Sequence, residues 1–532
     1  MDSKLEGWLP HLIDAIPVAA RKNHTSLYAI ALEGWRRGLG VTFFNDDRNR
    51  IGCSLTYNGR SYPFIGSSGE LITDEIVDIC DDKGKTNEYL SNADVPIPLG
   101  RKFDESNTVD EILSYAEEIK YPLVLKPTDG RAGRGVYAGI RNSDELNYAL
   151  KSVRDKLGYK NVLLQQYVTG DEVRIYVLDG RVLAASNRKP ANILGDGIST
   201  AKVLIERKNE LRKKVPSLYF RPIKIDKEVH NALKGKGYTL ESVPRKGERI
   251  LLRSVSNLSK GGESVDITSM LTEEQRDIAV RATEAVPGLV QCGVDMIINE
   301  ETGSGVVLEL NTRPGIGNHL FPVEGQATDI PKEIVDFYIP ETKGIKTDDS
   351  NVYFEFKNII GVLKEKATAE IDVCPYPERL VAHRLVVNGE VNTLLLYNKI
   401  QRLAFENAIH GYVKSDVSEN LIIVVGSTSK QVFEDFLHQV ENIFKEHRLT
   451  LAEIEEYTRP VLAGFRLLDA VNDMSLKKLR EEVKDTVQKR QSIEKEKARI
   501  DRRIDLMQSS MSWKLSSPIR VITKTFKKRP KK

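Results

Sequence analysis

The stretch "VLELNTRPGIGNH", residues 307–319, begins as a hydrophobic strand and ends in polar residues and a turn. Side chains two positions apart on a strand lie on the same face, so Glu309 and Asn311 present a carboxylate and an amide oxygen side by side. Such oxygens are ligands for hard divalent cations. A half-buried strand with a solvated polar edge explains the same pattern, so other parts of the chain must decide between the two interpretations.

A carboxylate on a neighbouring strand favours the cation. Asp295 lies in the predicted strand "QCGVDMIIN", residues 291–299, fourteen residues before Glu309. If the two strands form an antiparallel pair, Asp295, Glu309 and Asn311 converge on one face. Two carboxylates buried together without a cation are costly. We therefore predict that these three residues bind Mg²⁺ (or Mn²⁺).

A glycine-rich hairpin supplies a second chemical signal. In "YPLVLKPTDGRAGRGVYAGI", residues 121–140, Lys126 ends one strand and glycines fill the loop before the next strand. Such a loop lets backbone N–H groups approach phosphate oxygens, while the lysine adds a point charge. The segment "DDKGKT", residues 81–86, lacks the glycine spacing of a P-loop, and the hairpin is not a Rossmann fingerprint because it joins two strands. A flexible hairpin without a ligand is the alternative.

Residues 80–340 resemble an ATP-grasp carboxylate–amine ligase, and especially the ATP-grasp module of cyanophycin synthetases and bifunctional glutathione synthetases. The order and spacing of five segments carry this resemblance: "YPLVLKPTDGRAGRGV", "VLLQQYVTGDEVRIYVLDGRVLAASNRKP", "KGYTLESVPRKGERILLRSVSNLSKGGESVD", "CGVDMII" and "VLELNTRPGIGNHLFPVEG". The resemblance implies an α/β (α+β) fold with the ATP-grasp architecture. It also implies ATP as the nucleotide.

The resemblance assigns a role to each candidate residue. It implies that Lys83 and Lys126 hold the nucleotide phosphates, with Lys126 and Arg253 acting on the transferring phosphoryl group. The remaining nucleotide contacts that it implies are Gly133, Gly135, Gln165, Gln166, Val168 and Glu172. The side that binds the carboxylate substrate is implied to contain Arg174, Arg188, Asn257, Gly261 and Gly262.

Some of these assignments have a structural alternative, and one departs from the family pattern. Gln165 stands where many relatives carry glutamate, although the hinge contact to adenine is mainly through the backbone. Arg174 and Arg188 are also explained as surface arginines at strand edges, and Lys83 as a loop cap. Arg253 lies in the apolar run "ILLRSV", where a buried guanidinium needs an anion.

The family implies a two-step reaction, in which a carboxylate attacks the γ-phosphoryl group of ATP and an amine then displaces phosphate. The expected product is an amide, either in a cell-envelope polymer of a bacterium or in a peptide-like compound. Two other functions stay open. One is a phosphotransferase that stops at the phosphorylated product, and the other is a nucleotide-binding scaffold of a membrane-associated assembly. The scaffold is disfavoured because the predicted metal ligands Asp295, Glu309 and Asn311 and the lysine Lys126 are all present, and a protein without catalytic activity does not need them.

Length and composition predict several domains in a soluble protein. The chain has 532 residues, 40% of them hydrophobic and 29% charged, with a formal net charge of +3. This charge gives no reason to expect a nucleic-acid partner. Four widely spaced cysteines and an acidic N-terminus without a signal-peptide pattern favour the cytoplasm, with a possible position at the inner face of the membrane. We predict a pre-ATP-grasp domain (1–80), an ATP-grasp domain (81–342), a third domain (352–447), a helical or coiled-coil segment (448–510) and a basic tail (511–532).

The third domain resembles an acylphosphatase, which implies a ferredoxin-type α/β sandwich. The resemblance is carried by "RLVVNGEVNTLLLYNKIQRLAFENAIHGYVKSD", but Tyr397 stands where acylphosphatases carry the phosphate-binding arginine, and Ser415 where they carry an asparagine. We interpret this domain as catalytically silent. Heptad positions after it predict a coiled coil that joins copies of the chain. The tail combines Trp513, Phe526 and other apolar residues with six basic residues from 524 onward, which is typical of contact with an anionic membrane; a solvated tail is the alternative.

Overall fold

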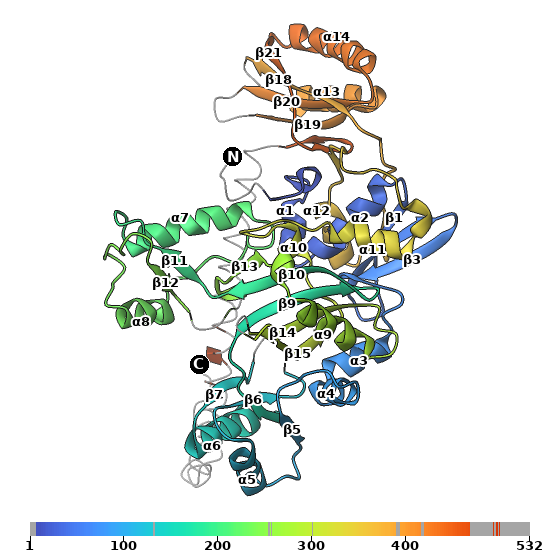
Figure 1. Ribbon diagram of the computed structural model, residues 1–532. Coiled ribbons are helices and arrows are strands. Elements are labelled where there is room, and N and C mark those ends of the chain that lie inside the picture. Colours follow the sequence, from blue (N-terminus) through green and yellow to red (C-terminus); the bar gives the residue numbers. More distant parts are fainter. Residues whose placement is uncertain are drawn as a thin grey trace, which may run out of the picture.

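The computed structural model describes residues 7–130, 134–253, 256, 258–299, 302–389, 394–415 and 420–468, together with 493, 496, 497 and 500. Figure 1 shows a central sheet with one lobe below it, a small lobe beside it, and an N-terminal and a C-terminal unit above. The central sheet has the order β13-β10-β9-β14-β15. Its strands are β9 (Asp171–Leu178), β10 (Arg181–Lys189), β13 (Glu263–Asp266), β14 (Gln291–Ile298) and β15 (Gly305–Asn311).

Helices cover the face of the central sheet that is opposite the candidate site. Ile76, Ile278 and Val294 belong to one buried apolar cluster that joins α3 (Asp74–Asp81), α9 (Glu273–Glu284) and the sheet. The predicted helix at 272–286 is therefore confirmed as α9, which begins with a capping box between Thr272 and Gln275. Since α3 packs here, the structure extends the ATP-grasp unit a few residues before the predicted boundary at 81.

The lobe below the central sheet is built from the glycine-rich hairpin and its neighbours. Its sheet has the order β5-β8-β6-β7, and β6 and β7 pair antiparallel, which confirms the predicted hairpin. Helices α5 and α6 share a buried cluster with these strands. The elements are β5 (Gly100–Phe103), α5 (Val109–Ile119), β6 (Leu123–Pro127), β7 (Tyr137–Ile140), α6 (Ser143–Lys151), the π-helix η3 (Ser152–Lys156) and β8 (Val162–Gln166). The preceding helix α4 (Lys83–Asn92) packs with α3 in the apolar cluster of the central sheet through Leu90.

A small lobe is inserted between β10 and β13. It has its own apolar cluster, which includes Ile193, Ile205 and Val229. In Figure 1 it projects from the side of the central sheet. Its elements are β11 (Asn192–Leu194), α7 (Ala201–Lys214), α8 (Lys227–Gly235) and β12 (Arg249–Leu251), followed by the 3-10 turns η4 (Leu258–Lys260) and η5 (Thr268–Met270).

The N-terminal unit receives a return segment from far along the chain. β17 (Glu370–Asp372) pairs with β1 (Gly40–Asn45), and Phe354 and Phe356 pack against Tyr28 and Phe43. Residues 354–373, which we expected in the third domain, therefore pack with the N-terminal unit. Its other elements are η2 (Pro10–Leu12), α1 (Val18–Arg21), α2 (Thr25–Arg36), β2 (Ile51–Tyr57), β3 (Arg60–Ile65), β4 (Ser68–Gly69) and α12 (Lys357–Lys364).

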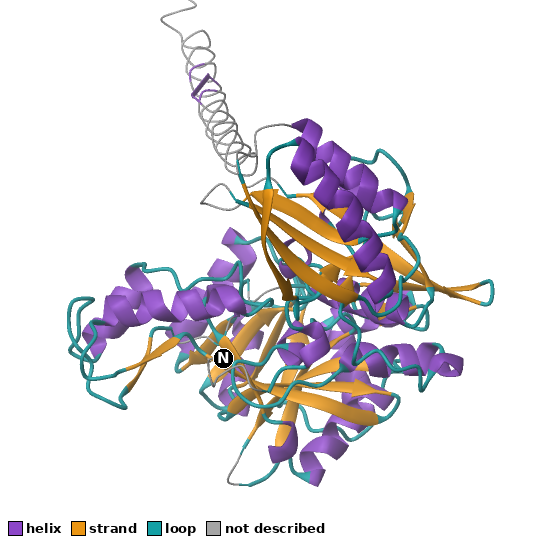
Figure 2. Ribbon diagram, turned by 90° about the horizontal axis from the view of Figure 1, so that it is seen from above, coloured by secondary structure: helices purple, strands orange, loops and turns teal. Residues whose placement is uncertain are grey.

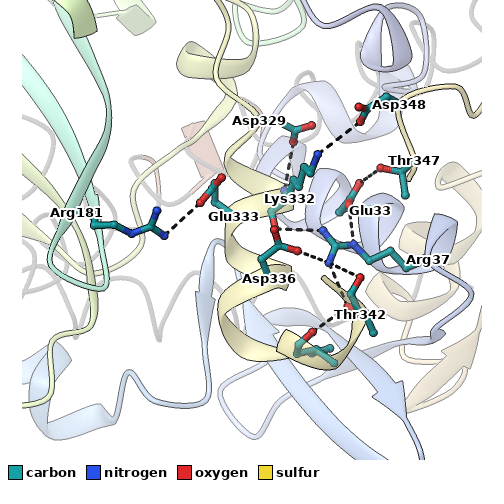
Figure 3. A network of polar contacts seen from close by, with 11 residues as sticks. Glu33, Arg37, Arg181, Asp329, Lys332, Glu333, Asp336, Thr342, Thr347 and Asp348 are labelled. Atoms are coloured by element: carbon teal, nitrogen blue, oxygen red, sulfur yellow. Dashed lines mark hydrogen bonds and ion pairs between the residues drawn. The ribbon is translucent and has the colours of Figure 1, made fainter. Parts of the chain in front are cut away.

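The segment at 340–350, expected as a linker, is packed against α2. Thr347 is buried and donates a hydrogen bond to Glu33, whose other oxygen accepts from Arg37 at 2.7 Å. Arg37 also binds Asp336 at 2.6 Å, in α11 (Ile330–Tyr338) (Figure 3). Arg37 also donates a hydrogen bond to Thr342 in η6 (Pro340–Thr342). The short helix α10 (Gly317–Leu320) precedes α11 in the chain. A buried ion pair with such partners holds α11 and the segment in place.

The C-terminal unit has a β-α-β-β-α-β order and the strand order β21-β18-β20-β19, with β23 added at one edge. This is the ferredoxin-type sandwich that the sequence predicts; its likeness to acylphosphatases stays a prediction. Its two helices pack together on one face (Figure 2). The elements are β18 (Val381–Asn388), α13 (Leu394–Glu406), β19 (His410–Ser415), β20 (Leu421–Ser427), α14 (Lys430–Glu446), β21 (Thr450–Glu456), β22 (Val461–Leu462), with which β16 (Val352–Tyr353) pairs, and β23 (Phe465–Leu467).

The prediction that the chain is helical from 448 onward is wrong for residues 450–467. Those residues form β21, β22 and β23, and β21 completes the sheet by pairing with β18. The acidic residues of β21 concealed its strand character, but charged residues are expected on an edge strand. The predicted coiled coil from 469 and the basic tail lie outside the described residues, apart from four isolated positions. No helix among the described residues has the length and apolar character needed to cross a bilayer.

Candidate active site

One face of the central sheet brings the predicted ligands together. β14 and β15 are antiparallel, with Asp295 opposite Glu309 and Gly293 opposite Asn311, so the predicted strand pair is confirmed. On the other side of β14, β9 places Arg174 opposite Asp295. Residues paired across a sheet share a face. This face carries six of the predicted site residues: Glu172, Arg174, Arg188, Asp295, Glu309 and Asn311.

The carboxylate of Asp295 is bound by arginines of the chain. Arg174 donates two hydrogen bonds of 2.7 Å to it, and Arg188 Nη2 lies 3.4 Å from its Oδ1. Burial raises the pKa of Asp295, but Arg174 and Arg188 outweigh this and hold the pKa below its ordinary value. Asp295 is therefore ionised. Because the arginines compensate its charge, burial alone does not require a metal here, contrary to our argument from the sequence.

The donor groups nevertheless suit a hard divalent cation. Glu309 is 39% exposed, and its Oε2 lies 3.4 Å from Nζ of Lys83. The Nδ2–H of Asn311 donates a hydrogen bond to Oδ2 of Asp295 at 3.2 Å. A rotation of the amide by 180° would place its oxygen, in place of the nitrogen, on the side of Asp295. Two carboxylates and an amide oxygen are the ligand types that Mg²⁺ takes alongside water and phosphate. The three residues thus fit the cation predicted for them.

Two lysines lie close to Glu309, Lys83 at the start of α4 and Lys126 in the lower lobe. Asp82 caps α4 by accepting hydrogen bonds from Gly84 and Lys85, which fixes Lys83 as the first residue of that helix. Lys126 is half-buried at the end of β6. Burial and the neighbouring charge of Lys83 lower the pKa of Lys126 to about 8, against an opposing effect of Glu309. Two cations held close together in this way form a site for a polyanion.

The pKa of Lys126 predicts a pH dependence of nucleotide affinity. Because its pKa is about 8, Lys126 loses its proton as the pH rises from 7 to 9. If the charged form binds the triphosphate, the Kd for ATP rises about tenfold over this range. Calorimetric titration at several pH values measures it. In Lys126→Arg, which stays charged, the Kd is expected to stay constant; a constant Kd in the natural protein would exclude Lys126 from phosphate binding.

The glycine loop follows Lys126 directly. Gly135 has φ +80°, and a Cβ there would lie 2.8 Å from Cγ of Pro127. A side chain at this position is therefore strained both by the backbone and by the contact. Gly133, the other predicted loop glycine, lies outside the described residues.

A cavity of about 450 Å³ lies at the hinge between the lower lobe and the central sheet. Its lining includes residues 166–169, with the predicted Gln166 and Val168, and Ile297 and Val306. The last two share the face of Asp295 and Glu309, and they were missed from the sequence although Ile297 follows Asp295 by two positions. Gln165 points elsewhere and donates to the carbonyl of Pro98. A cavity of this size with a mixed polar and apolar lining can hold a nucleobase, which has apolar faces and hydrogen-bonding edges.

The predicted residues of the small lobe are not brought to this face. Arg253 donates to Asp226 at 2.7 Å and also binds Glu228 and the carbonyl of Lys260. Burial lowers the pKa of Arg253, but these carboxylates raise it above the ordinary value. The anion that a buried Arg253 needs is thus supplied by α8, so the sequence argument for a bound phosphoryl group does not hold in this conformation.

The glycines of the same lobe have structural contacts. Gly261 has φ +100°, and a Cβ there would lie 2.8 Å from a side-chain atom of Ile223. The carbonyl of Gly262 accepts a hydrogen bond from Arg212. Asn257 lies outside the described residues. These three assignments to a substrate site stay predictions.

Comparison with known proteins identifies the class. Residues 82–181 match the family "Carbamoyl-phosphate synthase L chain, ATP binding domain", and residues 239–337 match the "RimK-like ATP-grasp domain". The first match includes Lys83 and Lys126, and the second includes Asp295, Glu309 and Asn311. The chain contains an ATP-grasp domain, and the predicted fold class is confirmed.

The relatives include cyanophycin synthetases and bifunctional proteins of glutathione biosynthesis. The chain is similar to cyanophycin synthetase of Nostoc sp. strain PCC 7120, with 32% identity over 271 residues, which is 50% of this chain and 30% of the relative. It is 27% identical over 322 residues to the "Glutathione biosynthesis bifunctional protein GshAB" of Clostridium perfringens, covering 58% of this chain and 40% of the relative. A solved bifunctional glutathione synthetase from Pasteurella multocida has 25% identity and a TM-score of 0.45, covering 56% and 41% of the two chains. The chain thus spans less than half the length of these relatives.

Proposed function

We propose that the chain is an ATP-dependent carboxylate–amine ligase that forms an amide and releases ADP and phosphate. The observation that carries this proposal is the arrangement of Asp295, Glu309 and Asn311 on one sheet, close to Lys83 of α4 and Lys126 of the lower lobe. The hinge cavity lies further along the same face. A nucleotide can therefore place its base in that cavity and its phosphates next to Lys83 and Lys126.

In this mechanism the chain positions groups and compensates charge. An oxygen of the substrate carboxylate attacks the γ-phosphorus, the bond to the bridging oxygen breaks, and ADP leaves. The amine nitrogen then attacks the acyl carbon, phosphate leaves, and the nitrogen loses a proton. Lys83 and Lys126 hold the phosphates, and Asp295, Glu309 and Asn311 would hold Mg²⁺, which neutralises the charge of the phosphate oxygens.

The substrate carboxylate would be bound near Arg174 and Arg188. Arg188 bridges Glu172 at 2.9 Å and Asp295 at 3.4 Å, and Arg174 is occupied by Asp295. A cation that takes over the charge of Asp295 would leave guanidinium donors available for a carboxylate. This order of events makes carboxylate binding depend on Mg²⁺ and nucleotide.

A screen for ADP release tests the proposed function. Amino acids and sugar acids are supplied with ATP and Mg²⁺, with and without amines, and hydroxylamine is added to trap an acyl phosphate as a hydroxamate. A ligase gives the hydroxamate and, with an amine, the amide. A stable phosphorylated product without a hydroxamate would instead identify a phosphotransferase. A chain that binds nucleotide but releases no ADP with any acid would be a scaffold.

The basic tail is proposed to bring the enzyme to an anionic membrane surface, and the predicted coiled coil to join copies of the chain. We expect a variant that lacks residues 513–532 to sediment several-fold less with anionic phospholipid vesicles, because it loses apolar anchors and basic residues together. Neutral vesicles serve as the control, and light scattering of the full chain measures whether the predicted coiled coil joins copies. Equal sedimentation of both chains would remove the membrane from the proposal.

A further inference from the structure

A histidine and two aspartates from three separate segments meet outside the proposed active site. His11 lies in η2, Asp329 is the N-cap of α11, and Asp348 lies in the segment that follows η6. One ligand atom of each lies within 4.8 Å of the other two. In Figure 3, Asp329 and Asp348 lie on the same side of the polar network, next to the Lys332 ammonium.

The imidazole of His11 points into this cluster and has no hydrogen bond there. Its side chain is 4% exposed, and its Nε2 lies 3.0 Å from Oδ2 of Asp329. That contact lacks the alignment of a hydrogen bond, and among the described residues Nε2 has no other partner. A buried polar atom without a partner is unfavourable. Two ligand atoms that approach without bonding each other are expected where both bind a third group.

The surroundings compensate the negative charge of the two aspartates only in part, because Asp329 has the ion-pair contact with His11 and Asp348 a long one with Lys332. Arg37 is taken up by Glu33 and Asp336, and Arg36 donates to the carbonyls of His11 and Val352. Lys332 stands 3.9 Å from Asp348, beyond hydrogen-bond distance. The acids of this region outnumber its bases: Glu33, Asp329, Asp336 and Asp348 against Arg36, Arg37 and Lys332.

We propose that His11, Asp329 and Asp348 bind a transition-metal ion, with Zn²⁺ as the best match. An imidazole nitrogen with two carboxylate oxygens suits Zn²⁺ better than Mg²⁺ or Ca²⁺, which take oxygen ligands. Tetrahedral coordination places ligand atoms about 3.3 Å apart. The 3.0 Å separation of His11 and Asp329 is close to this, and Asp348, whose side chain is 64% exposed, has room to close the remaining gap. Water completes the coordination.

The metal would join three segments that already have fixed positions. Arg36 holds the backbone of His11 at 2.9 Å, and Thr347 next to Asp348 is buried against Glu33. Asp329 uses its other oxygen to cap α11 by accepting from the backbone N–H of Lys332. The ion would thus fasten the N-terminal unit and the segment at 343–351 to the end of the ATP-grasp domain. Its role is structural and independent of ATP turnover.

The test is a zinc titration of the full chain after removal of metals by a chelator. Competition with a chromophoric chelator measures the stoichiometry and the Kd, and thermal denaturation gives an independent signal, because an ion that binds the folded chain raises the Tm. We expect one Zn²⁺ per chain and an increase in Tm of several degrees. Asp348→Asn and Asp329→Asn should each weaken binding by about tenfold or more. Asparagine at 329 still caps α11, and the side chain of Asp348 is 64% exposed, so the fold of both variants is preserved.

Two controls make the outcome specific. Asp349→Asn removes a neighbouring exposed carboxylate that contacts Arg379 instead, and it should bind Zn²⁺ as the natural chain does. Glu309→Gln removes a ligand of the proposed active site and should leave this stoichiometry unchanged. The proposal is overturned if the natural chain binds no zinc, or if Asp348→Asn and Asp329→Asn bind it as tightly as Asp349→Asn. Neither result bears on the ligase activity.

Discussion

Glu309→Gln is expected to reduce ADP release by about 1,000-fold or more while the chain stays folded. Glutamine keeps the shape of the side chain but removes the charge that would bind the cation and orient the triphosphate. The stability of the fold depends little on this carboxylate, since it is 39% exposed and its ion pair with Lys83 measures 3.4 Å. The measurement is ADP release at saturating ATP and Mg²⁺, together with the Tm.

Glu284→Gln provides the matched control for this variant. Glu284 is an exposed residue at the end of α9, on the side of the sheet away from the site, so its substitution should leave ADP release unchanged. If Glu309→Gln retained full activity, the cation would have to be bound elsewhere. A large drop in Tm would show instead that Glu309 supports the fold, and would leave the assignment of the cation to Asp295 and Asn311 alone.

The alternation of side chains was sufficient to place the ligands on a common face. Residues 295, 309 and 311 could be paired from the sequence because a short hairpin connects their strands, and a short connection leaves few alternatives for the pairing. The same alternation would have identified Ile297 as part of the hinge cavity, since it lies two residues beyond Asp295. Local sequence patterns of this kind are therefore sufficient to predict the ligands of the cation.

Partners from distant parts of the chain could not be predicted in the same way. Asp226 and Glu228 lie 27 and 25 positions before Arg253, which they bind, and Arg174 binds Asp295 from a strand 121 positions earlier. The periodicity of hydrophobic residues does not predict an ion pair between residues that are distant in the sequence. The pairing of β17 with β1 is a further example, with Asp372 opposite Thr42 in a sheet whose order depends on the whole fold. The charges around a site are therefore harder to predict than its ligands.

Replacing Lys126 by methionine is expected to weaken ATP binding by about 10- to 100-fold without destabilising the chain. The ammonium of Lys126 is unfavourable in the free protein, because burial and the nearby Lys83 lower its pKa to about 8. Methionine has a similar volume, requires no hydration and does not repel Lys83. The Tm of Lys126→Met should thus equal or exceed that of the natural chain, although nucleotide binding is lost.

A loss of binding at equal or higher stability separates a ligand-binding lysine from a structural one. Calorimetric titration with ATP and Mg²⁺ gives the affinity, and Lys102→Met is the control, because Lys102 lies in the same lobe, is 39% exposed and pairs with Asp82 at 3.5 Å. That variant should bind ATP as the natural chain does. If Lys126→Met lowered the Tm and left the affinity unchanged, Lys126 would serve the packing of β6. In that case the buried ammonium of Lys126 would not bind a ligand. The phosphates of the nucleotide would then bind at a place other than this pair of lysines.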